Sequence, residues 1–122
     1  MLPGVSEMAD LTAHTAAVRA FAEERDWVKF HDPKSLVLAL VGEVGEVAEL
    51  LQWLPASEAA ELARAEPLRQ RMGEELADVL IYLVRLADVV GVDLVEAAMN
   101  KLADSGRRFP VDQVSGVAPS RP

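Results

Sequence analysis

Residues 40–53, "LVGEVGEVAELLQW", place three glutamates and two glycines in a segment whose other positions are mostly apolar. The spacing of the apolar residues predicts a helix, in which each residue turns by about 100° and residues three apart are neighbours. Glu43 and Glu46 are therefore adjacent, in the sector that also holds Leu36 and Leu50. This acidic pair lies within the apolar stripe that the fold has to bury.

A second acidic pair, Glu75 and Asp78, has the same spacing in "EELADVLIYLVRLA", residues 74–87. It shares its helix face with apolar residues such as Leu86. If the two apolar faces meet, four carboxylates converge, and without a counter-charge they would take up protons or destabilise the fold. A divalent cation resolves this conflict, and an all-oxygen ligand set favours Mg²⁺, with Mn²⁺ as the second choice.

Two other interpretations of the acidic pairs compete with a magnesium site. A di-iron bundle would need Glu-x-x-His on two helices, and neither pair has a histidine at its fourth place. Solvated surface acids would explain one such pair, but two pairs within apolar stripes favour a metal. Glycine costs about 1 kcal/mol relative to alanine inside a helix, so Gly42 and Gly45 are expected to provide room beside the acids, with close helix packing as the alternative.

Apolar periodicity and turn residues predict an all-α domain, bundle-like, with four main helices. The expected helices are residues 10–25, 33–53, 67–90 and 94–107, with a short extra helix at residues 57–65 that opens on a capping Ser57. Asp32 and Asp93 are the expected caps of the second and fourth main helices. A single domain is expected over residues 1–110, with residues 1–8 loose and residues 111–122 a disordered tail.

Composition limits the kinds of protein to be considered. The absence of cysteine excludes disulfides, zinc–thiolate sites and thiol nucleophiles. A formal net charge of −8 argues against a general nucleic-acid binder. No apolar run approaches the ~20 residues of a membrane span, and no signal peptide is recognisable. The expectation is a cytoplasmic protein without a membrane or nucleic-acid partner.

Three stretches of the chain resemble one known family. They are "FAEERDWVKFHDPKSLVLALVGEVGEVAELLQW" (21–53), "EELADVLIYLVRLA" (74–87) and "RRFP" (107–110). Together with the Glu-x-x-Glu and Glu-x-x-Asp pairs they resemble the all-α, MazG-type nucleoside triphosphate pyrophosphohydrolases, and within them the dCTP pyrophosphatase branch. The resemblance covers about residues 20–110.

The resemblance implies a function for the acidic pairs. Members of the family hydrolyse the bond between the α- and β-phosphates with Mg²⁺, so the expected reaction is dCTP and water to dCMP and pyrophosphate. The biological role would be the removal of unwanted nucleotides from the precursor pool. The resemblance assigns Glu43, Glu46, Glu75 and Asp78 to the metal and to catalysis, in agreement with the helical spacing.

The resemblance also implies substrate contacts. The five residues concerned are Trp27, Trp53 and Tyr82 around the base and Lys101 and Arg108 at the phosphates. The chain departs from the family at Ser105, where asparagine is typical, and at Val18, where close relatives carry a polar residue. These departures leave the base preference less determined than the type of reaction.

Three alternatives stay open at this point. The first is a related pyrophosphohydrolase that prefers dUTP or an oxidised nucleotide, and the second is a catalytically silent nucleotide-binding module. The third is a structural helical assembly protein, which would leave the buried acids unexplained. The second and third main helices are apolar over most of their circumference, which predicts a homo-oligomer, a tetramer before a dimer, with active sites near subunit contacts.

Overall fold

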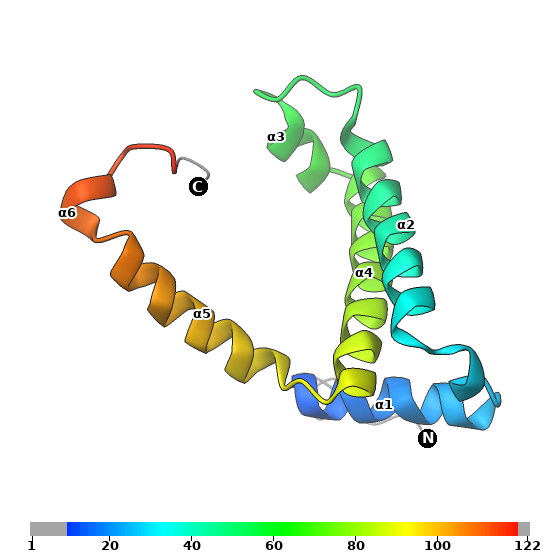
Figure 1. Cartoon of the computed structure of the whole chain (residues 1–122). Helices are drawn as coiled ribbons and strands as arrows, with labels where there is room; N and C mark the ends of the chain where they lie inside the picture. The colour runs from blue at the N-terminus through cyan, green and yellow to red at the C-terminus, as the bar shows by residue number, and fades with distance from the viewer. Residues whose placement is uncertain (1–9, 120–122) are drawn as a thin grey trace. The chain divides into compact units, whose positions relative to one another are not determined.

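The computed structural model describes residues 10–119, and within that range it contains helices and no strand (Figure 1). The elements are α1 (Leu11–Glu24), the 3₁₀ helix η1 (Val28–Phe30), α2 (Pro33–Leu51), α3 (Ala59–Arg64), α4 (Leu68–Val90), α5 (Leu94–Arg108) and α6 (Val111–Val114). The four main helices correspond to α1, α2, α4 and α5, so the all-α prediction is confirmed. None of these helices is long and apolar enough to cross a membrane.

The predicted caps are formed by short polar side chains. The Asp32 side chain accepts a hydrogen bond from the Ser35 backbone N–H at 2.9 Å, and the Asp93 side chain accepts one from Glu96 at 3.0 Å. Each bond satisfies an N–H group that has no partner within its helix. Gly91 ends α4 in the left-handed conformation, with φ of 75°, which glycine adopts without steric cost.

Two predicted boundaries were wrong. The second main helix ends at Leu51 rather than at Trp53, and a turn follows. The Leu54 N–H group bonds to the Leu51 carbonyl, three residues back, so a tighter turn replaces the α-helical pattern after Leu51. The N-cap of α3 is Glu58, whose side chain makes no capping hydrogen bond, so Ser57 does not have the predicted role.

The C-terminal segment also differs from the expectation. Val111–Val114 form α6 where a disordered tail was expected, because Pro110 is followed by a turn that Ser115 N–H closes on the Val111 carbonyl. The remaining expectations for the termini, residues 1–8 and residues 120–122, lie outside the described part of the chain. The single domain over residues 1–110 stays a prediction.

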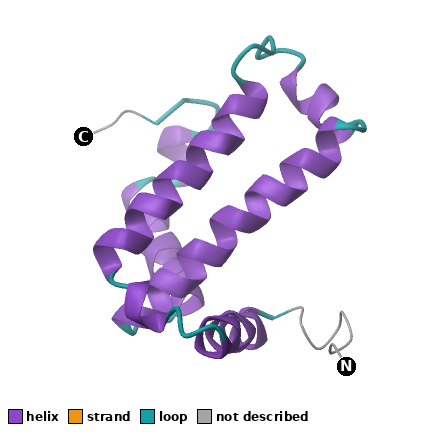
Figure 2. Ribbon diagram, turned by 90° about the vertical axis from the view of Figure 1, so that its right-hand side faces the viewer, coloured by secondary structure: helices purple, strands orange, loops and turns teal. Residues whose placement is uncertain are grey.

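The chain divides after Gly91 into two units, and the first of them contains the elements α1 to α4. Within this unit α2 and α4 lie side by side along most of their length, and α1 and α3 each pack against α4 (Figures 1 and 2). Leu36 of α2 and Val84 of α4 are almost completely buried, as are the small residues Ala22 and Ala87. The α2–α4 pair is thus the scaffold that positions the acidic residues. The second unit contains α5 and α6.

Candidate metal centre and adjoining pocket

The two acidic pairs meet between α2 and α4. Glu43, Glu46, Glu75 and Asp78 each offer a carboxylate oxygen, and these four atoms lie within 4.8 Å of one another. The convergence expected from the helical spacing is therefore present in the structure. Glu46 is exposed, whereas the other three side chains are half-buried. A small ion could reach the cluster from the side of Glu46.

The electrostatics of this acidic cluster are those of crowded like charges. A hydrogen bond with Glu46, burial and the neighbouring carboxylates raise the pKa of Glu75 from 4.5 to about 7. Burial, followed by the charges of Glu46 and Asp78, raises the pKa of Glu43. Among residues 10–119, no ion pair joins any of the four acids to a lysine or arginine. The described chain offers the cluster no direct counter-charge.

Two oxygen atoms of the cluster have no partner. Glu43 Oε2 and Glu75 Oε2 are both buried and make no hydrogen bond. Buried carboxylate oxygens are normally hydrogen-bonded or bound to a metal, because an unpartnered one keeps the full cost of its desolvation. Four converging oxygen donors with unpartnered atoms suit a hard divalent cation. The residues present therefore fit a metal ion.

The glycines of α2 do not have the expected steric role within this chain. A Cβ atom added at Gly42 or at Gly45 would meet no other atom within 4 Å. Neither close packing nor contact with the acids therefore requires glycine at these positions in one chain. The structure does not explain the two glycines.

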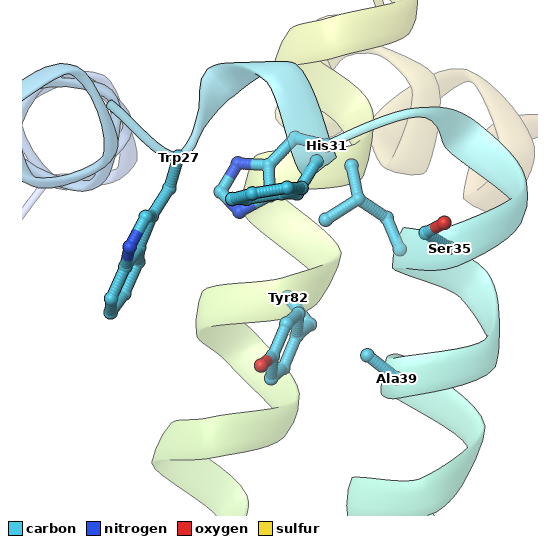
Figure 3. A pocket seen from close by; sticks show the side chains of 7 residues that line it. Trp27, His31, Ser35, Ala39 and Tyr82 are labelled. Atoms are coloured by element: carbon cyan, nitrogen blue, oxygen red, sulfur yellow. The ribbon is translucent and has the colours of Figure 1, made fainter. Parts of the chain in front are cut away.

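A cavity of about 250 Å³ lies at the N-terminal end of α2 (Figure 3). Its lining residues are Trp27, Phe30, His31, Ser35, Leu36, Ala39 and Tyr82. We call it the Trp27–Tyr82 pocket. Ala39 precedes Glu43 by one helical turn and Tyr82 follows Asp78 by one turn, so the pocket and the acidic cluster occupy consecutive turns of the same two helices.

The predicted substrate residues do not all line this pocket. Trp27 and Tyr82 do, whereas Trp53 follows the end of α2 and is 86% exposed. Lys101 and Arg108 lie on α5 in the second unit, and their contact with phosphates stays a prediction.

The structure also shows the surroundings of Ser105 and Val18, the two positions that depart from the family pattern. The Ser105 hydroxyl accepts a hydrogen bond from the Arg108 guanidinium at 3.3 Å, so its partner is on its own helix. Val18 is half-buried on α1 and does not line the Trp27–Tyr82 pocket. Within the first unit, Val18 is therefore not a contact of a base held in this pocket.

Sequence reasoning missed several lining residues, including Phe30 and His31. Both come from η1 and the turn after it, where the chain has no apolar periodicity that would assign a side chain to a face. Ser35 and Ala39 could have been found, because they lie on the α2 face that leads to Glu43 at helical spacing.

Comparisons with known proteins place these features in context. The sequence model of the MazG-like family matches residues 40–119. The chain is 51% identical over 98 residues to dCTP pyrophosphatase 1 of Bos taurus, a match that covers 80% of this chain and 58% of the relative. It is 51% identical over 90 residues to dCTP pyrophosphatase 1 of Homo sapiens, covering 74% of this chain and 53% of the relative. The chain thus spans little more than half the length of these relatives.

A solved structure is also similar. A pyrophosphatase from Archaeoglobus fulgidus DSM 4304 superimposes with a TM-score of 0.72 at 35% sequence identity. The superposition covers 78% of this chain and 87% of the archaeal one. The helical architecture found here therefore also occurs in that pyrophosphatase.

Proposed function

The chain belongs to the MazG-like family, and from this premise we propose that it is a metal-dependent nucleoside triphosphate pyrophosphohydrolase. The observation that carries the proposal is the acidic cluster, in which four carboxylate oxygens lie within 4.8 Å and two oxygens are buried without a partner. A purely structural helical protein would have no use for such a cluster, because it repels itself and is poorly solvated.

The proposed substrate is dCTP, with dCMP and pyrophosphate as products. Relatives about half identical to the chain are named dCTP pyrophosphatase 1, which supports this choice over dUTP or an oxidised nucleotide. The Trp27–Tyr82 pocket supports it further, because its aromatic rings offer faces on which a base can stack. The pocket lies one helical turn from the acids, so a base held there would have its phosphates beside the acidic cluster.

The four acids, Glu43, Glu46, Glu75 and Asp78, would hold the metal, for which Mg²⁺ is proposed and Mn²⁺ is the alternative. When bound, Mg²⁺ supplies positive charge that neutralises the charge developing on the phosphates. The pKa of Glu75 is raised to about 7 in the metal-free cluster, so metal binding is expected to weaken below that pH, where the proton competes with the metal for this carboxylate.

The proposed reaction is an attack of water on the α-phosphorus. A bond forms between the water oxygen and the α-phosphorus, and the bond to the bridging oxygen of the β-phosphate breaks, so that pyrophosphate leaves. A carboxylate of the acidic cluster accepts the water proton. Lys101 and Arg108 are proposed to bind the departing phosphates. Trp53 is proposed to stack on the base from a neighbouring subunit of the proposed homo-oligomer, because within one chain it lies at the opposite end of α2 from the Trp27–Tyr82 pocket.

A substrate panel tests this function directly. Each common NTP and dNTP is incubated with the protein and Mg²⁺, and pyrophosphate and nucleoside monophosphate are both measured. We expect equal amounts of the two products, with dCTP the best substrate. Release of orthophosphate instead of pyrophosphate would mean that the bond between the β- and γ-phosphates is cleaved. If a nucleotide with another base is the best substrate, the proposed reaction stands and the proposed substrate is wrong. No release from any nucleotide would contradict an enzyme.

We also propose that the protein is a homo-oligomer, a tetramer or a dimer. Large apolar side chains on α2 and α4 are exposed in the single chain, among them Leu38, Val41, Leu76 and Leu80. An exposed apolar surface of this kind is typical of a face that another subunit covers. Light scattering at micromolar concentration checks the oligomeric state, and a monomer there would contradict the proposal.

A further inference from the structure

Arg85 is a buried cation next to the Trp27–Tyr82 pocket. Its residue is only 6% exposed, in the apolar part of α4. Arg85 Nε donates to His31 Nδ1 at 3.0 Å, and its NH1 group donates to Asp88 Oδ2 at 2.9 Å. A second arginine, Arg19 of α1, also donates to the Asp88 carboxylate, through Nε at 2.9 Å. This Arg85 network ties α1 and the turn after η1 to α4.

The bond between Arg85 and His31 determines where the imidazole carries its proton. A guanidinium has only donors, so His31 Nδ1 has to be the acceptor and cannot bear a hydrogen. Burial, followed by the charge of Arg85, lowers the pKa of His31 below its ordinary value of 6.5. The imidazole is therefore neutral near pH 7.5, and its one proton is on Nε2.

The ring of His31 borders the Trp27–Tyr82 pocket. His31 is a lining residue, and Figure 3 shows its ring beside Trp27 on the side of the space that Tyr82 also borders. Within residues 10–119, His31 Nε2 makes no hydrogen bond. A ring that Arg85 holds at Nδ1 has its Nε2–H group left as a donor, and the ring borders the pocket.

We infer that His31 is a specificity residue whose Nε2–H group donates to a carbonyl oxygen of the substrate base, and that Arg85 is the positioning residue that fixes this tautomer. The inference rests on the proposed function, since it needs a nucleotide whose base enters the Trp27–Tyr82 pocket. A cytosine ring carries such a carbonyl group, whereas an adenine ring carries none. A buried donor left unpaired disfavours a base that cannot accept from it.

The tautomer can be measured without any substrate. The ¹⁵N signals of the two ring nitrogens of His31 are recorded at pH 7.5, and a His14→Gln variant identifies them because His14 is the other histidine. We expect Nε2 protonated and Nδ1 unprotonated in the parent protein, and a mixture of both tautomers in Arg85→Met. A parent protein with Nδ1 protonated would overturn the positioning role of Arg85.

Equilibrium binding tests the role of the donor. The probes are the α,β-imido analogue of dCTP, which resists cleavage, and the matching imido triphosphate of deoxyribose without a base, both with Mg²⁺. His31→Phe keeps a flat ring but removes the donor, and we expect about tenfold weaker binding of the dCTP analogue, the loss of one hydrogen bond. Binding of the base-free probe should change less than twofold.

Two further variants distinguish the loss of the His31 hydrogen bond from a change in the packing of the pocket. His31→Gln places an amide N–H group near the position of Nε2, so it should recover most of the lost affinity. Arg85→Met should weaken binding about threefold in the parent and not at all in His31→Phe, since it acts through His31. Thermal melts identify any variant that does not fold, and the two His31 variants test the inference even if Arg85→Met does not fold.

The outcomes are distinct. Unchanged affinity of His31→Phe for the dCTP analogue, or equal losses for both probes, would overturn the inference. If the parent protein binds the analogue through its base but releases no pyrophosphate from dCTP, the proposed reaction fails and the inference stands. A parent protein that binds neither probe would overturn both.

Discussion

The acidic cluster and the Arg85 network both contain residues of α4, and they differ in whether the chain supplies charged partners for their side chains. In the Arg85 network the cation pairs with Asp88, the Asp88 carboxylate also pairs with Arg19, and His31 accepts a hydrogen bond from Arg85 Nε. In the acidic cluster four carboxylates face one another, and two of their oxygens have no partner. Arg85 is more deeply buried than any of the four acids, yet its charge has partners within the chain whereas theirs do not.

The pKa values show the same contrast. A hydrogen bond from Arg19 is the main reason that the pKa of Asp88 lies below its ordinary value. A hydrogen bond with Glu46 is the main reason that the pKa of Glu75 rises to about 7. A buried charge whose partners are supplied by the chain stabilises one conformation, whereas a cluster without partners costs stability until a ligand arrives.

The largest effect is expected from Glu46→Gln in the acidic cluster. Turnover should fall by about a thousandfold, roughly 4 kcal/mol in activation free energy, because a metal ligand and a charge are lost. The metal-free variant should melt at the same or a higher temperature than the parent near pH 8, since one repelling charge is gone. Activity assays and thermal melts, with chelator and with millimolar Mg²⁺, measure both quantities.

Glu49→Gln is the matched control for that variant, because Glu49 is an exposed glutamate one turn further along α2. It should leave turnover and melting nearly unchanged. Mg²⁺ should stabilise Glu46→Gln less than the parent. If Glu46→Gln melts lower without metal and gains as much from Mg²⁺ as the parent, Glu46 is a structural residue.

The second effect is expected from Asp88→Asn in the Arg85 network. Removing this carboxylate leaves the buried Arg85 cation without its ion-pair partner, so the free energy of unfolding should fall by about 3 kcal/mol. Urea denaturation measures the loss. Asp104→Asn is the control, since the ion pairs that Asp104 forms within residues 10–119, with Arg107 and Arg108, are exposed, and it should cost less than about 1 kcal/mol. If the two variants lose the same free energy of unfolding, the buried Arg85 network stabilises the fold no more than the surface ion pairs do.

The third effect concerns Trp53, which neither charged cluster contacts. Trp53→Ala should raise the KM for dCTP by about tenfold, within the 1–3 kcal/mol of a lost base stack, and leave metal binding intact. Its 86% exposure in the single chain predicts almost no change in the free energy of unfolding of that chain. Unchanged steady-state kinetics with dCTP would exclude Trp53 from the substrate site.

The smallest effect is the pH dependence of the metal-free fold. Glu75 has a folded pKa of about 7 against an ordinary value of 4.5, so the folded state binds its proton more tightly than the unfolded state. That contribution to stability is complete below about pH 4.5 and is lost as pH rises through about 7. Melting temperatures with chelator should therefore fall across this range, and the fall should be smaller in Glu75→Gln.

The Arg85 network has the opposite pH dependence. The lowered pKa of Asp88 means that its contribution is present above the ordinary value of 3.8 and is lost as pH falls through the folded pKa. Melts below pH 4 should therefore show a loss in the parent that Asp88→Asn lacks. A metal-free parent that becomes more stable between pH 4.5 and 7 would contradict the electrostatics described for the acidic cluster.

The predictable parts of the fold were those that depend on neighbours in the chain. Asp32 and Asp93 could be identified as caps because a short side chain reaches only the N–H groups of the next turn. Glu43 and Glu46 could be placed on one face because helical geometry alone sets their separation. The end of α2 lies two residues before the predicted one, because the Leu54 N–H group closes a tighter turn on the Leu51 carbonyl.

The parts that could not be predicted depend on residues distant in sequence. Arg85 directly follows an apolar run, and its partner His31 lies 54 positions earlier, while Arg19, the second partner of Asp88, lies 69 positions before that residue. His31 belongs to a turn whose side chains follow no period. Nothing in the local pattern indicated that the two residues would meet beside a pocket.

By itself the sequence determined an all-α chain, the caps of its main helices and two acidic pairs on apolar faces, because propensity, capping and helical spacing act over one or two turns. Only the tertiary structure decided that α2 and α4 meet with those faces together, that Trp27 and Tyr82 share a pocket while Trp53 does not, and that Arg85 orients His31. These features depend on which surfaces pack against each other, and that choice is made by burial over the whole chain rather than by neighbouring residues.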